Sequence, residues 1–114
     1  KRVYEKLKEV AKKKSIIYYE DLVIDCGLAL NLENIDDRNK LSYILGEISK
    51  HELDSKPQKP PISVLVVLKN NKEIMPSYGF FNYMDELGIR KLKEKDWEMR
   101  NRLMNWCYEY WSKH

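Results

Sequence analysis

His51 is the residue best suited to acid–base or metal chemistry, because acidic side chains lie close to it in the sequence. Glu47 precedes it by four residues and Asp54 follows it by three, and both spacings place side chains on one face of a helix. A zinc site needs about four converging ligands, and the His-Glu-x-x-His spacing of helical zinc sites is absent. We therefore interpret His51 as an exposed residue near the C-terminal end of a helix, and we expect no metal or other cofactor.

Cys26 and Cys107 are the other candidates for chemistry, and both lie within apolar patterns. A nucleophilic cysteine needs a neighbouring base or positive charge that lowers the pKa of its thiol, and neither residue has one nearby in the sequence. Their spacing fits neither a disulfide framework nor a zinc site, so we expect both in the core and the protein in a reducing cytoplasm. The four glycines are isolated, which excludes a phosphate-binding glycine loop. The sequence therefore predicts a protein that is not an enzyme.

The composition favours one small globular domain over residues 1–114. Of the 114 residues, 43% are apolar and 11% are aromatic, enough for a core of ordinary size. No apolar run approaches the roughly 20 residues of a membrane-spanning helix, so no membrane partner is expected.

The charge is distributed unevenly, although its sum is only +3. Residues 1–14 contain seven Lys or Arg against two Glu, whereas residues 15–39 contain one Arg against six acidic residues. Lys12, Lys13 and Lys14 fall at the predicted C-terminal end of a helix, where cations interact favourably with the helix dipole. These lysines either contact phosphates or remain solvated, and both interpretations stay open.

The elements that would position these residues follow from hydrophobic periodicity. Apolar residues recur at helical spacing in five segments and predict helices over residues 2–14, 19–26, 38–53, 80–87 and 95–112. The third helix would begin at a cap formed by Asp36 or Asp37. Gly46, in the middle of that helix, suggests close approach by another element.

A buried strand is predicted for Ile62–Leu68, an apolar run that follows Pro60 and Pro61. The pair Asn70-Asn71 favours a tight hairpin that returns along residues 73–76. We expect one joint core from the third helix, the strand and the last helix, made by Leu45, Ile48, Val64, Val66, Leu103 and Met104.

This order predicts an α+β protein, a small winged-helix-like domain in which helices surround a short β-hairpin and a long aromatic-rich helix closes the chain. Residues 38–53 would be the exposed helix, and the hairpin would be the wing. The candidate nucleic-acid-binding residues are Lys40, Tyr43, Lys50, Lys69, Asn71 and Lys72. Tyr43 is also the best candidate for a protein interface, because it lies on the polar side of its helix.

The segment Leu45-Gly46-Glu47-Ile48-Ser49, the strand that begins at Pro61 and the Pro76–Phe81 turn together resemble a set of small bacterial and prophage proteins. Those proteins combine a Leu-Gly-x-Ile-Ser helix, an apolar strand, a Pro-x-x-Gly-Phe turn and a Trp-rich last helix. The resemblance covers about residues 16–111, contains no catalytic signature, and implies a bacterial or phage setting.

A looser likeness is to the winged-helix domain of DNA alkyltransferases and alkyltransferase-like proteins, which also place a glycine-bearing helix before a proline-led apolar strand. Their reactive Pro-Cys-His-Arg is replaced here by Pro61-Ile62-Ser63-Val64, so alkyl transfer is excluded. The resemblance implies only a DNA-facing winged helix. Glu47, Glu52 and Asp54 count against that use of the helix, because helices that read the major groove present Arg, Lys, Asn or Gln to the bases.

Two functions therefore remain open from the sequence. One is weak duplex-DNA binding by a winged-helix domain of a bacterial or phage protein. The other is a protein-interaction module or small prophage or defence-related regulator that binds a protein partner through aromatic and acidic surface.

Overall fold

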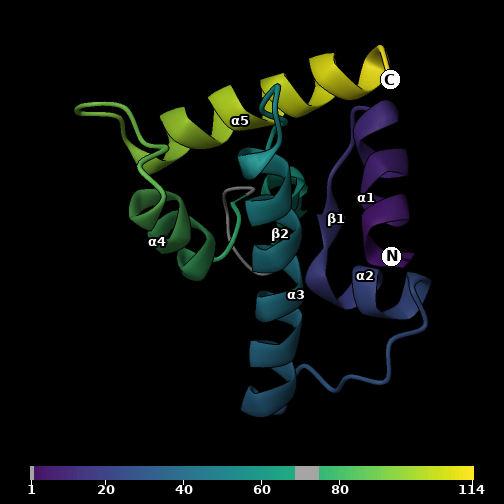
Figure 1. The fold of residues 1–114 in the computed structure, drawn as a ribbon. Coiled ribbons are helices and arrows are strands. Elements are labelled where there is room, and N and C mark those ends of the chain that lie inside the picture. Colours follow the sequence, from purple (N-terminus) through teal and green to yellow (C-terminus); the bar gives the residue numbers. More distant parts are fainter. Residues whose placement is uncertain (1, 69–74) are drawn as a thin grey trace.

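Helix α3 (Ile35–Asp54) runs through the middle of the protein, with helix α1 (Arg2–Lys12) on one side and helix α4 (Tyr78–Glu86) on the other (Figure 1). The long helix α5 (Asp96–Ser112) lies across one end and packs against α1. This computed structural model describes residues 2–68 and 75–114.

The predicted helices are confirmed, with ends that differ by a few residues. Helix α2 (Tyr19–Asp25) is followed by Gly27 at a φ of +63°, a left-handed conformation that glycine adopts without strain. The expected cap of α3 is wrong, because Asn34 precedes the helix and its side-chain oxygen accepts hydrogen bonds from the N–H groups of Asp36 and Asp37, at 2.8 and 3.3 Å. Asparagine is as good a helix cap as aspartate, so only the register was misjudged.

The predicted strand over Ile62–Leu68 is mostly wrong. Ile62–Leu65 forms a 3₁₀-helix, η1, and only Val66–Val67 extends as strand β2. Strand β2 pairs in parallel with β1 (Ile17–Tyr18). The physical reason is burial: every residue from Ile62 to Val67 is buried, so the run lacks the alternation that distinguishes a strand from a buried helical turn.

The expected hairpin tip lies outside the described residues, and with it Lys69, Asn71 and Lys72. The chain does return at this point, because the N–H of Leu68 donates to the carbonyl of Met75 at 2.9 Å. The protein is thus a mostly helical α+β fold with a two-stranded parallel sheet in the described part of the chain.

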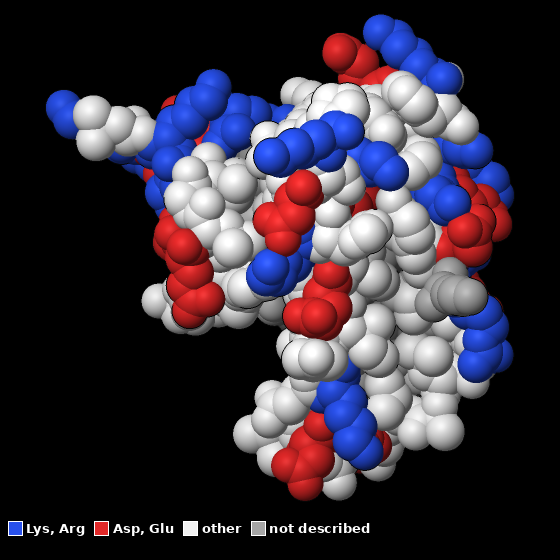
Figure 2. Space-filling model, viewed as in Figure 1, with Lys and Arg blue, Asp and Glu red and all other residues white. Residues whose placement is uncertain are grey.

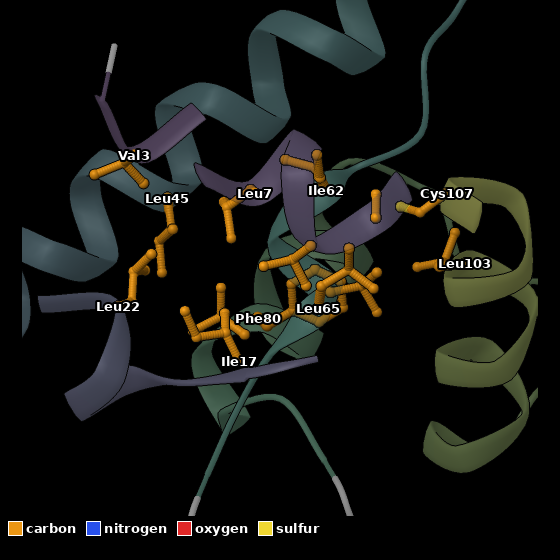
Figure 3. Close-up of a cluster of buried hydrophobic side chains, with 14 of the residues drawn as sticks. Val3, Leu7, Ile17, Leu22, Leu45, Ile62, Leu65, Phe80, Leu103 and Cys107 are labelled. Atoms are coloured by element: carbon orange, nitrogen blue, oxygen red, sulfur yellow. The ribbon is translucent and has the colours of Figure 1, made fainter. Parts of the chain in front are cut away.

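The core is centred on η1, which packs against α1, α3 and α5. Ile62 and Leu65 have no solvent exposure, and side chains from the helices and from β1 meet around them (Figure 3). All these elements contribute to one hydrophobic cluster.

The buried face of α3 is rotated from the expected one. Leu41, Leu45 and Leu53 are buried, but the turn between them buries Ser49 and Glu52, while Ile48 stays half-buried. Met104, also expected in the core, is half-buried too, and the other four expected core residues are buried. Polar groups occupy this face because they bond to η1: the hydroxyls of Ser49 and Ser63 lie 2.6 Å apart.

Leu45→Ala should lower the free energy of unfolding by about 2–5 kcal/mol, because it leaves a cavity beside η1. Denaturant unfolding followed by circular dichroism measures the loss. Ile24→Ala is the matched control: Ile24 is 73% exposed, so its truncation should cost less than about 0.5 kcal/mol. A loss below about 1 kcal/mol for Leu45→Ala would contradict the packing described.

Candidate functional site

A groove of about 460 Å³ lies between α3 and α4. Its floor consists of the core residues Leu45, Ser63 and Phe80, and the rings of Tyr43 and Tyr83 line it from the two helices. Figure 2 shows the surface hollowed between α4 and the first half of α3, with mainly uncharged atoms around the hollow. The volume is within the usual range for ligand pockets, about 300–1,000 Å³.

Helix α3 presents one continuous face to this groove. The lining residues of α3 other than Leu45 follow helical spacing, and they are Asn39, Ser42, Tyr43, Gly46 and Glu47. Gly46 was expected to permit close approach, and Tyr83 of α4 does approach: a Cβ at position 46 would lie 3.7 Å from its ring, an ordinary contact distance. A Cβ at position 46 would therefore be tolerated, and the approach of Tyr83 does not require a glycine there.

The α4 side of the groove is held by Tyr19, at the start of α2. Its hydroxyl accepts a hydrogen bond from the N–H of Ser77 at 3.3 Å, and burial raises the pKa of this tyrosine. Ser77 in turn caps α4, because its hydroxyl accepts from the N–H of Phe80 at 3.4 Å. The first turn of α4 is therefore fixed relative to α2.

Tyr43 stands between this groove and a second, more open depression. That depression lies between α3 and the segment before it, and its lining residues include Leu28, Leu30 and Ile44. The side chain of Tyr43 is 69% exposed although apolar surface lies on both sides of it. An exposed aromatic side chain on a rigid helix between two apolar depressions is typical of an interface anchor.

Of the lysines predicted to bind nucleic acid, the two that the structure describes, Lys40 and Lys50, do not line this groove. Lys40 lines only the second depression and pairs with Asp37 at 3.8 Å, while Lys50 pairs with Asp54 at 2.9 Å. Helix α3 as a whole carries five acidic and three basic residues. Its lysines thus have carboxylates on their own helix, which reduces the positive potential that phosphate binding needs.

The sequence interpretation missed Phe80 and Tyr83 as lining residues, and it considered Glu47 only as a neighbour of His51 and as a counter-argument to DNA binding. Phe80 and Tyr83 are three residues apart in α4, and this spacing indicates that their side chains share one face of the helix. What the sequence could not show is that α4 folds back onto α3.

The residues considered first for chemistry are not placed for it. Cys26 and Cys107 are buried as expected, and burial raises the pKa of both thiols. His51 is exposed, as expected for a helix end. Within residues 2–68 and 75–114, no group of three or more His, Cys, Asp or Glu side chains is arranged to hold a metal ion.

Glu52 is the one acidic side chain fully buried in the described chain. One carboxylate oxygen accepts from the N–H of Ile62 at 2.9 Å, and the other has no hydrogen-bond partner among the described atoms. Burial raises the pKa of Glu52 from 4.5 to about 7, although Ile62, Tyr4 and Lys59 act in the opposite direction. The carboxylate in turn contributes, after burial, to raising the pKa of Tyr4.

Glu52 should make the protein less stable as the pH rises from about 5 to about 8. Glu52 keeps its proton to a higher pH in the folded state than in the unfolded state. Its contribution to stability is therefore fully present below about pH 4.5 and is lost as the pH rises through about 7. The loss is about 3 kcal/mol. Denaturant unfolding at pH 5 and pH 8 measures it.

Glu52→Gln keeps an acceptor for Ile62 but cannot ionise, so this variant should lose the pH dependence. Glu47→Gln, which removes an exposed carboxylate from the same helix, should retain it. Equal pH dependence in Glu52→Gln and the unmodified chain would rule out Glu52 as the source.

Comparisons with models of protein families, with curated protein sequences and with solved structures find no match to this chain. Among the helices of the described residues, none combines the length and the hydropathy required to cross a bilayer.

Proposed function

We propose that this chain is a non-enzymatic protein-interaction module, whose α3–α4 groove takes up an apolar segment of a partner protein. The carrying observation is Tyr43: it is 69% exposed on the rim of an aromatic groove whose floor is core. Large aromatic side chains on rigid supports provide most of the affinity in many interfaces, because little conformational entropy is lost when they are buried.

The dimensions of the groove favour a short segment rather than a broad surface. A volume of about 460 Å³ accommodates a few side chains of a peptide, and recognition of a short helix or extended segment in an apolar groove is a recurring mode of protein binding. The hydroxyl and amide groups of Ser42, Ser77 and Asn39 lie among the lining residues and could bond to the peptide backbone.

Tyr43→Ala should weaken peptide binding at least about tenfold, since it removes the exposed ring of the groove. The probes are peptides of about 12 residues, selected from a random phage-displayed library on the immobilised protein and measured by fluorescence anisotropy. Tyr78→Ala is the matched control, because Tyr78 is 74% exposed on α4 but does not line the groove.

Peptides that bind both tyrosine variants as well as the unmodified protein would place the binding surface elsewhere. A library from which no peptide binds with a dissociation constant below about 100 μM would contradict the proposed function.

A second candidate function, nucleic-acid binding, is supported by the end of α1. Lys12, Lys13 and Lys14 are exposed, and only Lys13 has a carboxylate within ion-pair distance in the described chain, Glu9 at 3.4 Å. Helix α5 packs beside this end, since the hydroxyl of Tyr108 donates to the carbonyl of Ser15 at 2.9 Å. This second proposal includes a winged-helix domain that would contact DNA through α3. Because Lys40 and Lys50 of α3 are already paired with carboxylates, the end of α1 is the better phosphate contact.

Duplex DNA should bind weakly at about 50 mM salt and be released by about 200 mM, because few phosphates are neutralised. The double replacement Lys12→Ala with Lys14→Ala should reduce the salt slope by about two, measured by anisotropy of a labelled duplex. Lys40→Ala with Lys50→Ala removes the same charge from α3 and should change the slope less. No detectable binding at about 50 mM salt would eliminate this candidate.

A further inference from the structure

Glu47 is the one charged residue that lines the α3–α4 groove within the described part of the chain. It is exposed, and no described cation lies within ion-pair distance of it. The nearest basic residue along the helix, Lys50, has its ammonium 2.9 Å from the carboxylate of Asp54 instead. Lys50 still interacts with Glu47 electrostatically at longer range, but the groove offers a carboxylate that has no ion-pair partner among the described residues, beside its aromatic rings.

The position of this charge relative to Tyr43 is set by the helix. Glu47 follows Tyr43 by four residues, so the two Cβ atoms are about 6 Å apart on the same face of α3. A planar cation can then lie over the tyrosine ring while its edge bonds to the carboxylate. Guanidinium suits this geometry better than ammonium, because it stacks on aromatic faces and presents a flat fork of donors to a carboxylate.

We propose that the partner segment carries an arginine, whose guanidinium stacks on Tyr43 and pairs with Glu47. This inference rests on the proposed function and specifies the chemistry of the partner. The apolar floor then takes neighbouring side chains of the same segment, so the expected motif is an arginine flanked by aliphatic residues.

The test compares an acetylated leucine–arginine–leucine amide with its citrulline counterpart, which has the same shape without the charge. Titration of the isotope-labelled protein by NMR should shift the amide signals of Tyr43, Glu47 and Tyr83. The arginine peptide should bind about fivefold more tightly at low salt, the gain typical of an exposed ion pair with a cation–π contact. The advantage should shrink as salt is added.

Glu47→Gln should bring the two peptides to equal affinity, by weakening only the arginine peptide. Glu86→Gln is the control, because Glu86 is an exposed carboxylate of α4 that does not line the groove. It should preserve the fivefold difference.

Three outcomes would overturn the arginine proposal. If both peptides shift the groove signals with equal affinity, the groove binds peptides without charge selection, and the proposed function stands alone. If the difference persists in Glu47→Gln, the guanidinium pairs elsewhere. If neither peptide shifts the groove signals at millimolar concentration, the arginine proposal fails, and failure of the library selection as well would remove the proposed function.

Discussion

The buried hydrogen bond from the N–H of Ile62 to the carboxyl group of Glu52 determines where the chain goes after α3. It fixes the start of η1 against the last turns of that helix, in a place without solvent. Because α1, α3 and α5 all pack against η1, their positions depend on it. A carboxyl group is an unusual choice here, since its burial is costly once it is charged.

The groove is supported from below by η1. Ser63 belongs both to η1 and to the groove floor, and its hydroxyl is bonded to that of Ser49. Tyr19 joins the opposite wall to α2 through the backbone of Ser77. An aromatic surface supported at both sides is preorganised, so a ligand loses little binding free energy in ordering it.

The sequence predicted the helices well, because their apolar residues recur at a clear spacing, and it identified Tyr43 as exposed from its place on the polar side of α3. The prediction failed where the hydrophobic pattern has no periodicity. All residues of Ile62–Leu65 are buried, so the 3₁₀ conformation of this segment follows from tertiary contacts. The ion pair between Lys50 and Asp54 was readable from its helical spacing. The local sequence pattern does not encode contacts between distant segments. Two such contacts are the pairing of β1 with β2 and the packing of α3 against α4 around the groove.

The central place of η1 also bears on how the chain is made. Helices α1, α2 and α3 emerge from the ribosome before Ile62, and although α1 contacts α2, the faces of α1 and α3 that pack on η1 lack this partner until η1 follows. Helix α1 also packs against α5, which is synthesised last of these elements. The ring of Tyr4 lies edge to face against the ring of Trp111, with 6.1 Å between the ring centroids. The segment before η1 is thus expected to complete its packing only after α5 has been synthesised, which leaves an interval in which chaperones have access to its apolar faces.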